Sequence, residues 1–133
     1  MKFVRLLQEL TKADLSLAGG KGANLGELVS AGMNVPQGFV LTTAGYRHCI
    51  PKVRLPEINV RDLPALEAVT SKIQPEIENT SLPEEVRQEV LETYRKMGSP
   101  TVAVRSSATT EDLPSASFAG QQETYLNIQG ESA

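Results

Sequence analysis

The hydrophobic positions of this chain follow two patterns, one typical of strands and one typical of helices. The strand-like segments are short runs of apolar and β-branched residues, and they fall at residues 3–7, 39–42, 101–104 and 124–126. Such runs favour β-structure because branched and aromatic side chains pack well on a pleated surface. The last two runs flank a polar segment, so we expect them to pair as a hairpin.

Helical segments carry apolar residues three and four positions apart, which is the spacing of one helix face. They fall at residues 24–29, 66–77 and 81–98. We expect Gly32 and Gly98 to end the first and the last helix in a left-handed cap, and Pro75 to kink or end the middle one. A further short helix is expected after the second strand, capped by Thr42 or Thr43. The combined pattern predicts an α+β fold with helices packed on a small mixed sheet.

Composition and charge exclude several classes of protein. The 133 residues suffice for one core, and a net charge of −3 with acids and bases interspersed indicates neither a nucleic-acid surface nor a polybasic membrane patch. No apolar run is long enough to span a bilayer, and we find no signal peptide. The single cysteine, Cys49, excludes an intrachain disulfide framework. We therefore expect a soluble cytoplasmic protein that binds neither nucleic acid nor membrane.

Residues 102–127 combine the chemistry expected of an anion-binding loop between two strands. Arg105 ends the first strand with a permanently charged guanidinium, whose planar fork suits bidentate contact with phosphate. A hydroxyl cluster follows, and then a small-residue run containing Ser117, Ala119 and Gly120 keeps bulk off the backbone, so that N–H groups can cradle phosphates. The residues alone leave open an ordinary Ser/Gly-rich hairpin that binds no ligand.

A second glycine-rich segment lies at residues 19–22, just before the first predicted helix. A glycine turn that enters a helix offers free N–H groups and the positive end of the helix dipole to an anion, and Lys21 adds a mobile charge. The sequence GGKGANLG has neither the spacing and Lys-Ser/Thr ending of a P-loop nor the G-x-G-x-x-G pattern, so Walker or Rossmann chemistry is not inferred. On the residues alone, a glycine turn with an exposed lysine is the favoured interpretation.

Two long motifs occur in order along the chain. They are LAGGKGANLGEL, followed by VPQGFVLTTAGY, and VRSSATTEDLPSASFAGQQETYLN. Together they resemble the amino-terminal nucleotide-binding region of phosphoenolpyruvate synthase (pyruvate, water dikinase), which is shared with pyruvate phosphate dikinase and rifampicin phosphotransferase. The resemblance runs from about Leu15 to Asn127 and is weak between residues 51 and 99. It implies that residues 1–133 are the first subdomain of an ATP-grasp-like domain, with the rest of that domain and a phosphohistidine domain beyond Ala133.

The resemblance implies ATP binding and gives roles to individual residues. Charged side chains reach the phosphates and the small-residue backbone closes over them, which assigns nucleotide contacts to Lys21, Arg105, Ser117, Ala119, Gly120 and Thr124. In these enzymes a phosphoryl group passes from ATP to a histidine on a separate swivelling domain, and then to pyruvate or another acceptor. The histidine motif of that domain has no counterpart here, so His48, the only histidine, is not a catalytic candidate.

Glu111, Asp112 and Glu123 lie near the predicted clamp, and Mg²⁺ favours carboxylates beside phosphates. The resemblance instead implies that the metal ligands lie beyond Ala133, so we assign no Mg²⁺ ligand in this chain. The expected function is ATP binding as the amino-terminal part of a pyruvate, water dikinase-type phosphotransferase, which is incomplete alone. The chain is then either a fragment of such an enzyme or a short gene product that works with a partner chain supplying the missing domains. The alternative is a non-catalytic module that keeps the fold and senses nucleotide or binds a partner.

Overall fold

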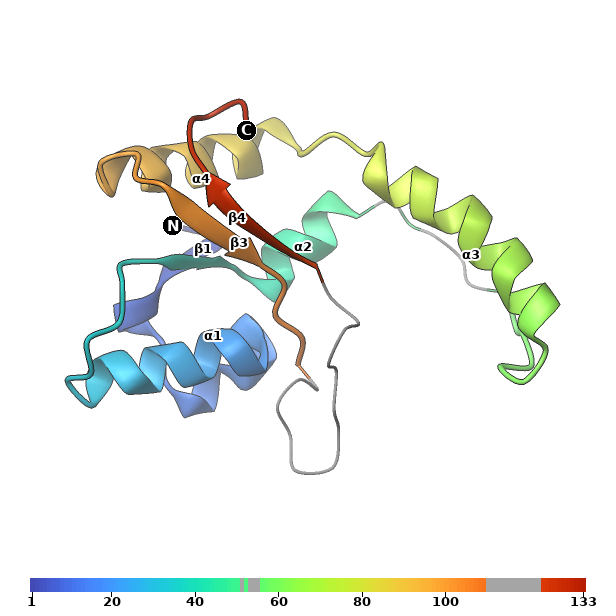
Figure 1. Cartoon of the computed structure of the whole chain (residues 1–133), viewed down its shortest axis with the longest axis horizontal. Coiled ribbons are helices and arrows are strands. Elements are labelled where there is room, and N and C mark those ends of the chain that lie inside the picture. Colours follow the sequence, from blue (N-terminus) through green and yellow to red (C-terminus); the bar gives the residue numbers. More distant parts are fainter. Residues whose placement is uncertain (51, 53–55, 110–122) are drawn as a thin grey trace.

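The computed structural model describes residues 1–50, 52, 56–109 and 123–133 (Figure 1). These residues contain four α-helices and four strands that pair antiparallel, which confirms the α+β class. The elements are β1 (Val4–Leu6), η1 (Leu7–Glu9), η2 (Lys12–Asp14), α1 (Leu15–Ser30), β2 (Phe39–Leu41), α2 (Thr43–Cys49), α3 (Leu63–Glu78), α4 (Glu84–Lys96), β3 (Val102–Arg105) and β4 (Thr124–Ile128). No helix in this described part of the chain is long and apolar enough to cross a membrane.

The strands of the described residues form two separate two-stranded antiparallel sheets. In the first, Val4 of β1 faces Leu41 of β2. In the second, Arg105 of β3 faces Thr124 of β4. The expectation of one mixed sheet is therefore wrong, because a short apolar run indicates where a strand forms but not which partner it takes.

The hydrophobic core lies between the first sheet, the two short 3-10 helices η1 and η2, and α1. Leu7, Leu10 and Ala18 are buried together at its centre. Partly buried side chains pack around them: Leu17, Leu25, Val29, Val35 and Val40. Gly26 lets α1 approach this centre closely, because a Cβ added there would lie only 2.4 Å from the carbonyl oxygen of Leu10. The position of α1 against the start of the chain is therefore fixed by close packing.

Helix α1 begins earlier than the apolar spacing indicated and bends at its glycine turn. Gly19 has φ 72° and ψ 173°, a conformation outside the helical region that is open essentially only to glycine. The bend divides a first turn of helix from the longer part that follows it. Gly32, just beyond the end of the helix, has φ 76°, as expected of a left-handed cap.

Two further local predictions are confirmed in α2 and α4. The Thr42 hydroxyl accepts a hydrogen bond from the Gly45 N–H at 3.3 Å and caps α2. Gly98 follows α4 with φ 86°. Helix α4 buries Val86 and Tyr94 of its predicted apolar stripe. These features form where expected because each depends on neighbours along the chain.

Helix α3 departs from the prediction in two ways. It continues through Pro75 to Glu78, and it buries none of its residues. Figure 1 shows it projecting away from the other elements. The expectation that both α3 and α4 pack on the sheet is therefore wrong for α3, whose helical spacing predicted the helix but not its packing partner.

Glu89 of α4 holds the start of the chain against that helix. Its Oε1 accepts hydrogen bonds from the N–H groups of Phe3 and Val4, both at 2.8 Å. Desolvation raises the pKa of this carboxyl, but the backbone N–H groups and the positive amino terminus outweigh it, so the pKa of Glu89 lies below its ordinary value. β1 is thus held by α4 as well as by β2.

Glu89→Gln is expected to lower the free energy of unfolding by about 1 kcal/mol at neutral pH, because charge-assisted hydrogen bonds become neutral ones. Since the folded pKa is depressed, this stabilisation is fully present above the unfolded glutamate pKa, about 4.3, and is lost as the pH falls through the folded pKa. Urea denaturation of the wild type and the variant, at neutral pH and at about pH 3, measures both effects.

Glu92→Gln is the matched control on the same helix. The Glu92 carboxylate forms an exposed pair with Lys96 at 2.8 Å, and solvent-exposed pairs of this kind contribute little to stability. Equal losses of stability at neutral pH in the two variants would contradict the anchoring role of Glu89.

Candidate functional site

Hydrogen bonds to backbone groups hold the glycine turn of α1 against the residues just after β3. The Gly20 N–H donates to the carbonyl oxygen of Ala108 at 2.8 Å. The Ser107 hydroxyl donates to the carbonyl oxygen of Ala18 at 2.8 Å and accepts from the Gly22 N–H at 3.2 Å. Two segments far apart in the sequence are therefore in direct contact.

Gly19 permits this contact because it has no side chain. A Cβ added to Gly19 would lie 2.3 Å from the Ser107 Oγ and 2.9 Å from the Ser107 carbonyl carbon. Its positive φ would also strain any other residue. Both the shape of the turn and its close approach to Ser107 thus require glycine at this position.

The sequence suggested that the turn offers free N–H groups to an anion, but two of these groups are bound within the protein. The N–H groups of Gly20 and Gly22 are bound by Ala108 and Ser107. The sequence could not show this, because the acceptors lie more than 80 positions away along the chain. Ser107 belongs to the cluster of hydroxyls that follows Arg105, and a hydroxyl there fits a ligand contact as well as an internal one.

Lys21 and Arg105, the two cationic residues assigned to phosphate, lie on adjoining segments. Lys21 donates from Nζ to the carbonyl oxygen of Ser106 at 3.0 Å, and Ser106 directly follows Arg105. Arg105 is exposed at the end of β3 and is paired across the hairpin with Thr124 at the start of β4. The structure thus brings the backbone positions of three assigned residues into one region.

The other three assigned residues, Ser117, Ala119 and Gly120, lie outside the described residues. Glu111 and Asp112 do too. Their predicted roles stay predictions.

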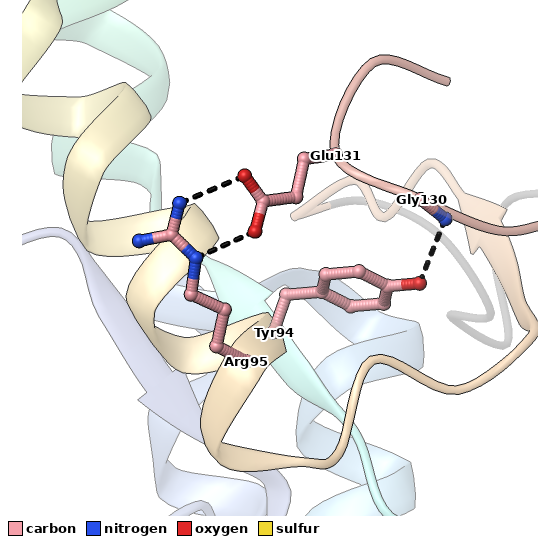
Figure 2. Close-up of polar contacts among 4 residues, drawn as sticks. All are labelled: Tyr94, Arg95, Gly130 and Glu131. Atoms are coloured by element: carbon pink, nitrogen blue, oxygen red, sulfur yellow. Dashed lines mark hydrogen bonds and ion pairs between the residues drawn. The ribbon is translucent and has the colours of Figure 1, made fainter.

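Tyr94 of α4 holds the opposite end of the β3–β4 hairpin (Figure 2). Its hydroxyl donates to the carbonyl oxygen of Pro100 at 2.8 Å and accepts from the Gly130 N–H at 3.0 Å. Pro100 precedes β3 and Gly130 follows β4, so one buried tyrosine contacts the outer ends of both strands. The hairpin is therefore attached to α4 at one end and meets the glycine turn at the end that carries Arg105 and Thr124.

An ion pair next to Tyr94 supports the same attachment. The Arg95 Nε and Nη2 donate to the two carboxylate oxygens of Glu131 at 2.5 and 2.7 Å (Figure 2). This bidentate hydrogen bonding raises the pKa of Arg95 and lowers the pKa of Glu131. Because both side chains are exposed, the pair adds geometric definition more than stability.

The described carboxylates near the hairpin do not fit a metal site. Glu123 accepts a hydrogen bond from the Tyr125 hydroxyl, and this carboxylate raises the pKa of Tyr125. In the ranges that the structure describes, no group of three or more His, Cys, Asp or Glu side chains is arranged to hold a metal ion.

His48 has packing and polar contacts of its own. Its ring stacks on Phe3 with the ring centroids 5.0 Å apart, and its Nε2 contacts the carboxylate of Glu85. The His48 side chain thus connects α2 to Phe3, which directly precedes β1, and to α4. These contacts give His48 a role in packing.

The chain is similar to known proteins over nearly its whole length. Residues 15–133 match the family model described as pyruvate phosphate dikinase, AMP/ATP-binding domain. The chain is 47% identical over 144 residues to the probable phosphoenolpyruvate synthase of Methanocaldococcus jannaschii, covering 98% of this chain and 12% of that protein. It is 43% identical to the phosphoenolpyruvate synthase of Aeropyrum pernix, covering 98% of this chain and 18% of that protein.

The chain therefore belongs to the pyruvate phosphate dikinase AMP/ATP-binding domain family. Within that family, its sequence is similar to the amino-terminal part of phosphoenolpyruvate synthases, which confirms the resemblance found in the two motifs. The chain spans only 12% to 18% of the length of the two relatives described above.

Proposed function

We propose that this chain binds the triphosphate of ATP through Lys21 and Arg105, as the amino-terminal part of a phosphoenolpyruvate synthase-like phosphotransferase. The observation that carries the proposal is the contact between the glycine turn and the residues after β3, which brings the two cationic positions onto adjoining segments. Membership in an AMP/ATP-binding domain family supports a nucleotide as the anion.

The two cations have different parts in this proposal. Arg105 offers a planar fork for two oxygens, whereas Lys21 offers a compact charge that exchanges the Ser106 carbonyl for a phosphate oxygen. Thr124 adds a hydroxyl from the facing strand. The backbone at Ser117, Ala119 and Gly120 closes over the phosphates; these assignments rest on the motif resemblance. The role of the site is to neutralise charge and to position the triphosphate.

The remaining chemistry belongs to parts outside this domain. Bound Mg²⁺ would neutralise further triphosphate charge, and its protein ligands are proposed to lie beyond residues 1–133. Transfer of the phosphoryl group to a histidine, and then to pyruvate or another acceptor, likewise needs further domains, on the same polypeptide or on a partner chain. Residues 1–133 alone would bind ATP without completing a reaction.

Lys21→Ala and Arg105→Ala are each expected to weaken Mg-ATP binding by about tenfold, because each removes one charge-assisted contact to the triphosphate. Isothermal titration calorimetry measures the affinity, and thermal shift confirms that each variant is folded. Lys72→Ala on α3 and Arg87→Ala on α4 are charge-matched controls, and they should bind as the wild type does. If the wild type and both site variants respond identically to Mg-ATP, the phosphate assignment fails.

A further inference from the structure

We propose that Ser107 is the positioning residue that holds Lys21 and Arg105 at the spacing that one polyphosphate requires. This inference rests on the proposed function and adds a residue to it. The Ser107 hydroxyl donates to the Ala18 carbonyl at 2.8 Å and accepts from the Gly22 N–H at 3.2 Å. The hydroxyl proton is bound by the Ala18 carbonyl and is not available to donate to a phosphate oxygen. The hydroxyl therefore acts by holding backbone segments in place.

The place of Ser107 in the sequence makes it the link between the two cations. Gly22 follows Lys21 directly, and Arg105 lies two residues before Ser107. A hydrogen bond from Gly22 to Ser107 therefore fixes the backbone beside Lys21 relative to the backbone beside Arg105. The second bond, to Ala18 on the other side of the glycine bend, prevents the turn from rotating about the first.

The hydroxyl also fills the available space. It occupies the position that a side chain on Gly19 would take, since a Cβ there would lie 2.3 Å from the Ser107 Oγ. Ser107 is exposed, so water can replace the lost hydrogen bonds when the hydroxyl is removed. Ser107→Ala should therefore leave the fold intact but let the turn move relative to β3.

Such movement weakens binding because charge stabilisation depends on preorganised geometry. Two cations held at a fixed spacing contact one triphosphate at the same time, whereas two that move independently lose part of that advantage. The effect of Ser107 should disappear once either cation has been removed, because one cation has no spacing to maintain.

The test is calorimetric titration of the 133-residue chain with Mg-ATP. Ser107→Ala is expected to weaken binding about tenfold, and Ser107→Thr, which keeps a hydroxyl, should stay within about threefold of the wild type. Ser106→Ala is the matched control and should not change the affinity. Ser106 binds Lys21 through its backbone carbonyl, which the substitution keeps, and among the described residues its hydroxyl forms no hydrogen bond.

The decisive comparison uses the double variant Lys21→Ala/Ser107→Ala. Its affinity should lie within about twofold of that of Lys21→Ala, because positioning acts only through the pair of cations. A merely structural role would weaken binding by the same factor in both backgrounds, which would overturn the inference. So would an affinity of Ser107→Ala equal to the wild type, or a Ser107→Ala chain that thermal denaturation shows to be unfolded.

These outcomes separate the inference from the function on which it rests. If the wild type does not bind Mg-ATP, or if Lys21→Ala and Arg105→Ala bind as tightly as the wild type, the proposed function fails. If both cation variants lose affinity and Ser107→Ala does not, ATP binding stands and the role of Ser107 is wrong.

Discussion

Gly26→Ala is expected to lower the free energy of unfolding by roughly 2 to 3 kcal/mol. A Cβ at this position would lie 2.4 Å from the carbonyl oxygen of Leu10 and 2.6 Å from its Cβ. Leu10 is 1% exposed and belongs to the core, so the overlap can be relieved only by moving α1 or the preceding backbone. The better helix propensity of alanine recovers only about 1 kcal/mol. Urea denaturation at neutral pH measures the loss.

Gly22→Ala is the matched control for this prediction. It lies one turn earlier in α1, where an added Cβ would contact side-chain atoms only, 3.0 Å from the Ala18 Cβ and 3.1 Å from the Val40 Cγ2. Small adjustments there are offset by the gain in helix propensity, so the stability should stay within about 1 kcal/mol of the wild type. Equal losses at positions 22 and 26 would show that the close contact with Leu10 is not the reason why Gly26→Ala lowers the stability.

The local elements of this fold could be predicted because their signals come from neighbours along the chain. Gly32 and Gly98 take positive φ after α1 and α4, and Thr42 caps α2 through an N–H three residues later. The strands lie where the apolar runs are. Each of these features depends on backbone preferences that a few consecutive residues determine.

The arrangement of the elements could not be predicted from the same signals. Apolar spacing predicted α3, but nothing in the spacing indicates that the helix projects without burying a residue. Strand propensity likewise did not distinguish one mixed sheet from two antiparallel pairs. Packing and pairing depend on contacts between distant residues, and the sequence pattern of one element contains no information about its partner.

The candidate site likewise has a part that the sequence predicted and a part that only the structure shows. The motif resemblance grouped Lys21 with Arg105, and the structure places them on adjoining segments. Two of the hydrogen bonds that join these segments link the Ser107 hydroxyl to backbone groups that any residue provides. Because backbone groups have no sequence signature of their own, only the structure could identify Ser107 as a connecting residue.

Gly19→Ala is expected to lower the free energy of unfolding by about 3 kcal/mol and to weaken Mg-ATP binding by about 100-fold. Gly19 has φ 72° and ψ 173°, which alanine adopts only with strain. The added Cβ would also lie 2.3 Å from the Ser107 Oγ, so the turn must separate from the residues after β3 and take Lys21 with it. Urea denaturation and calorimetric titration measure the two effects.

Gly32→Ala separates backbone strain from loss of the contact. Gly32 has a similar φ of 76°, but nothing lies within 4 Å of an added Cβ. This control should cost about 1 kcal/mol of stability and leave Mg-ATP affinity unchanged. If the Gly19 variant is folded and binds Mg-ATP as tightly as the Gly32 variant, the contact between the turn and Ser107 is not needed for binding. The structural reason for assigning Lys21 and Arg105 to one phosphate site would then be lost.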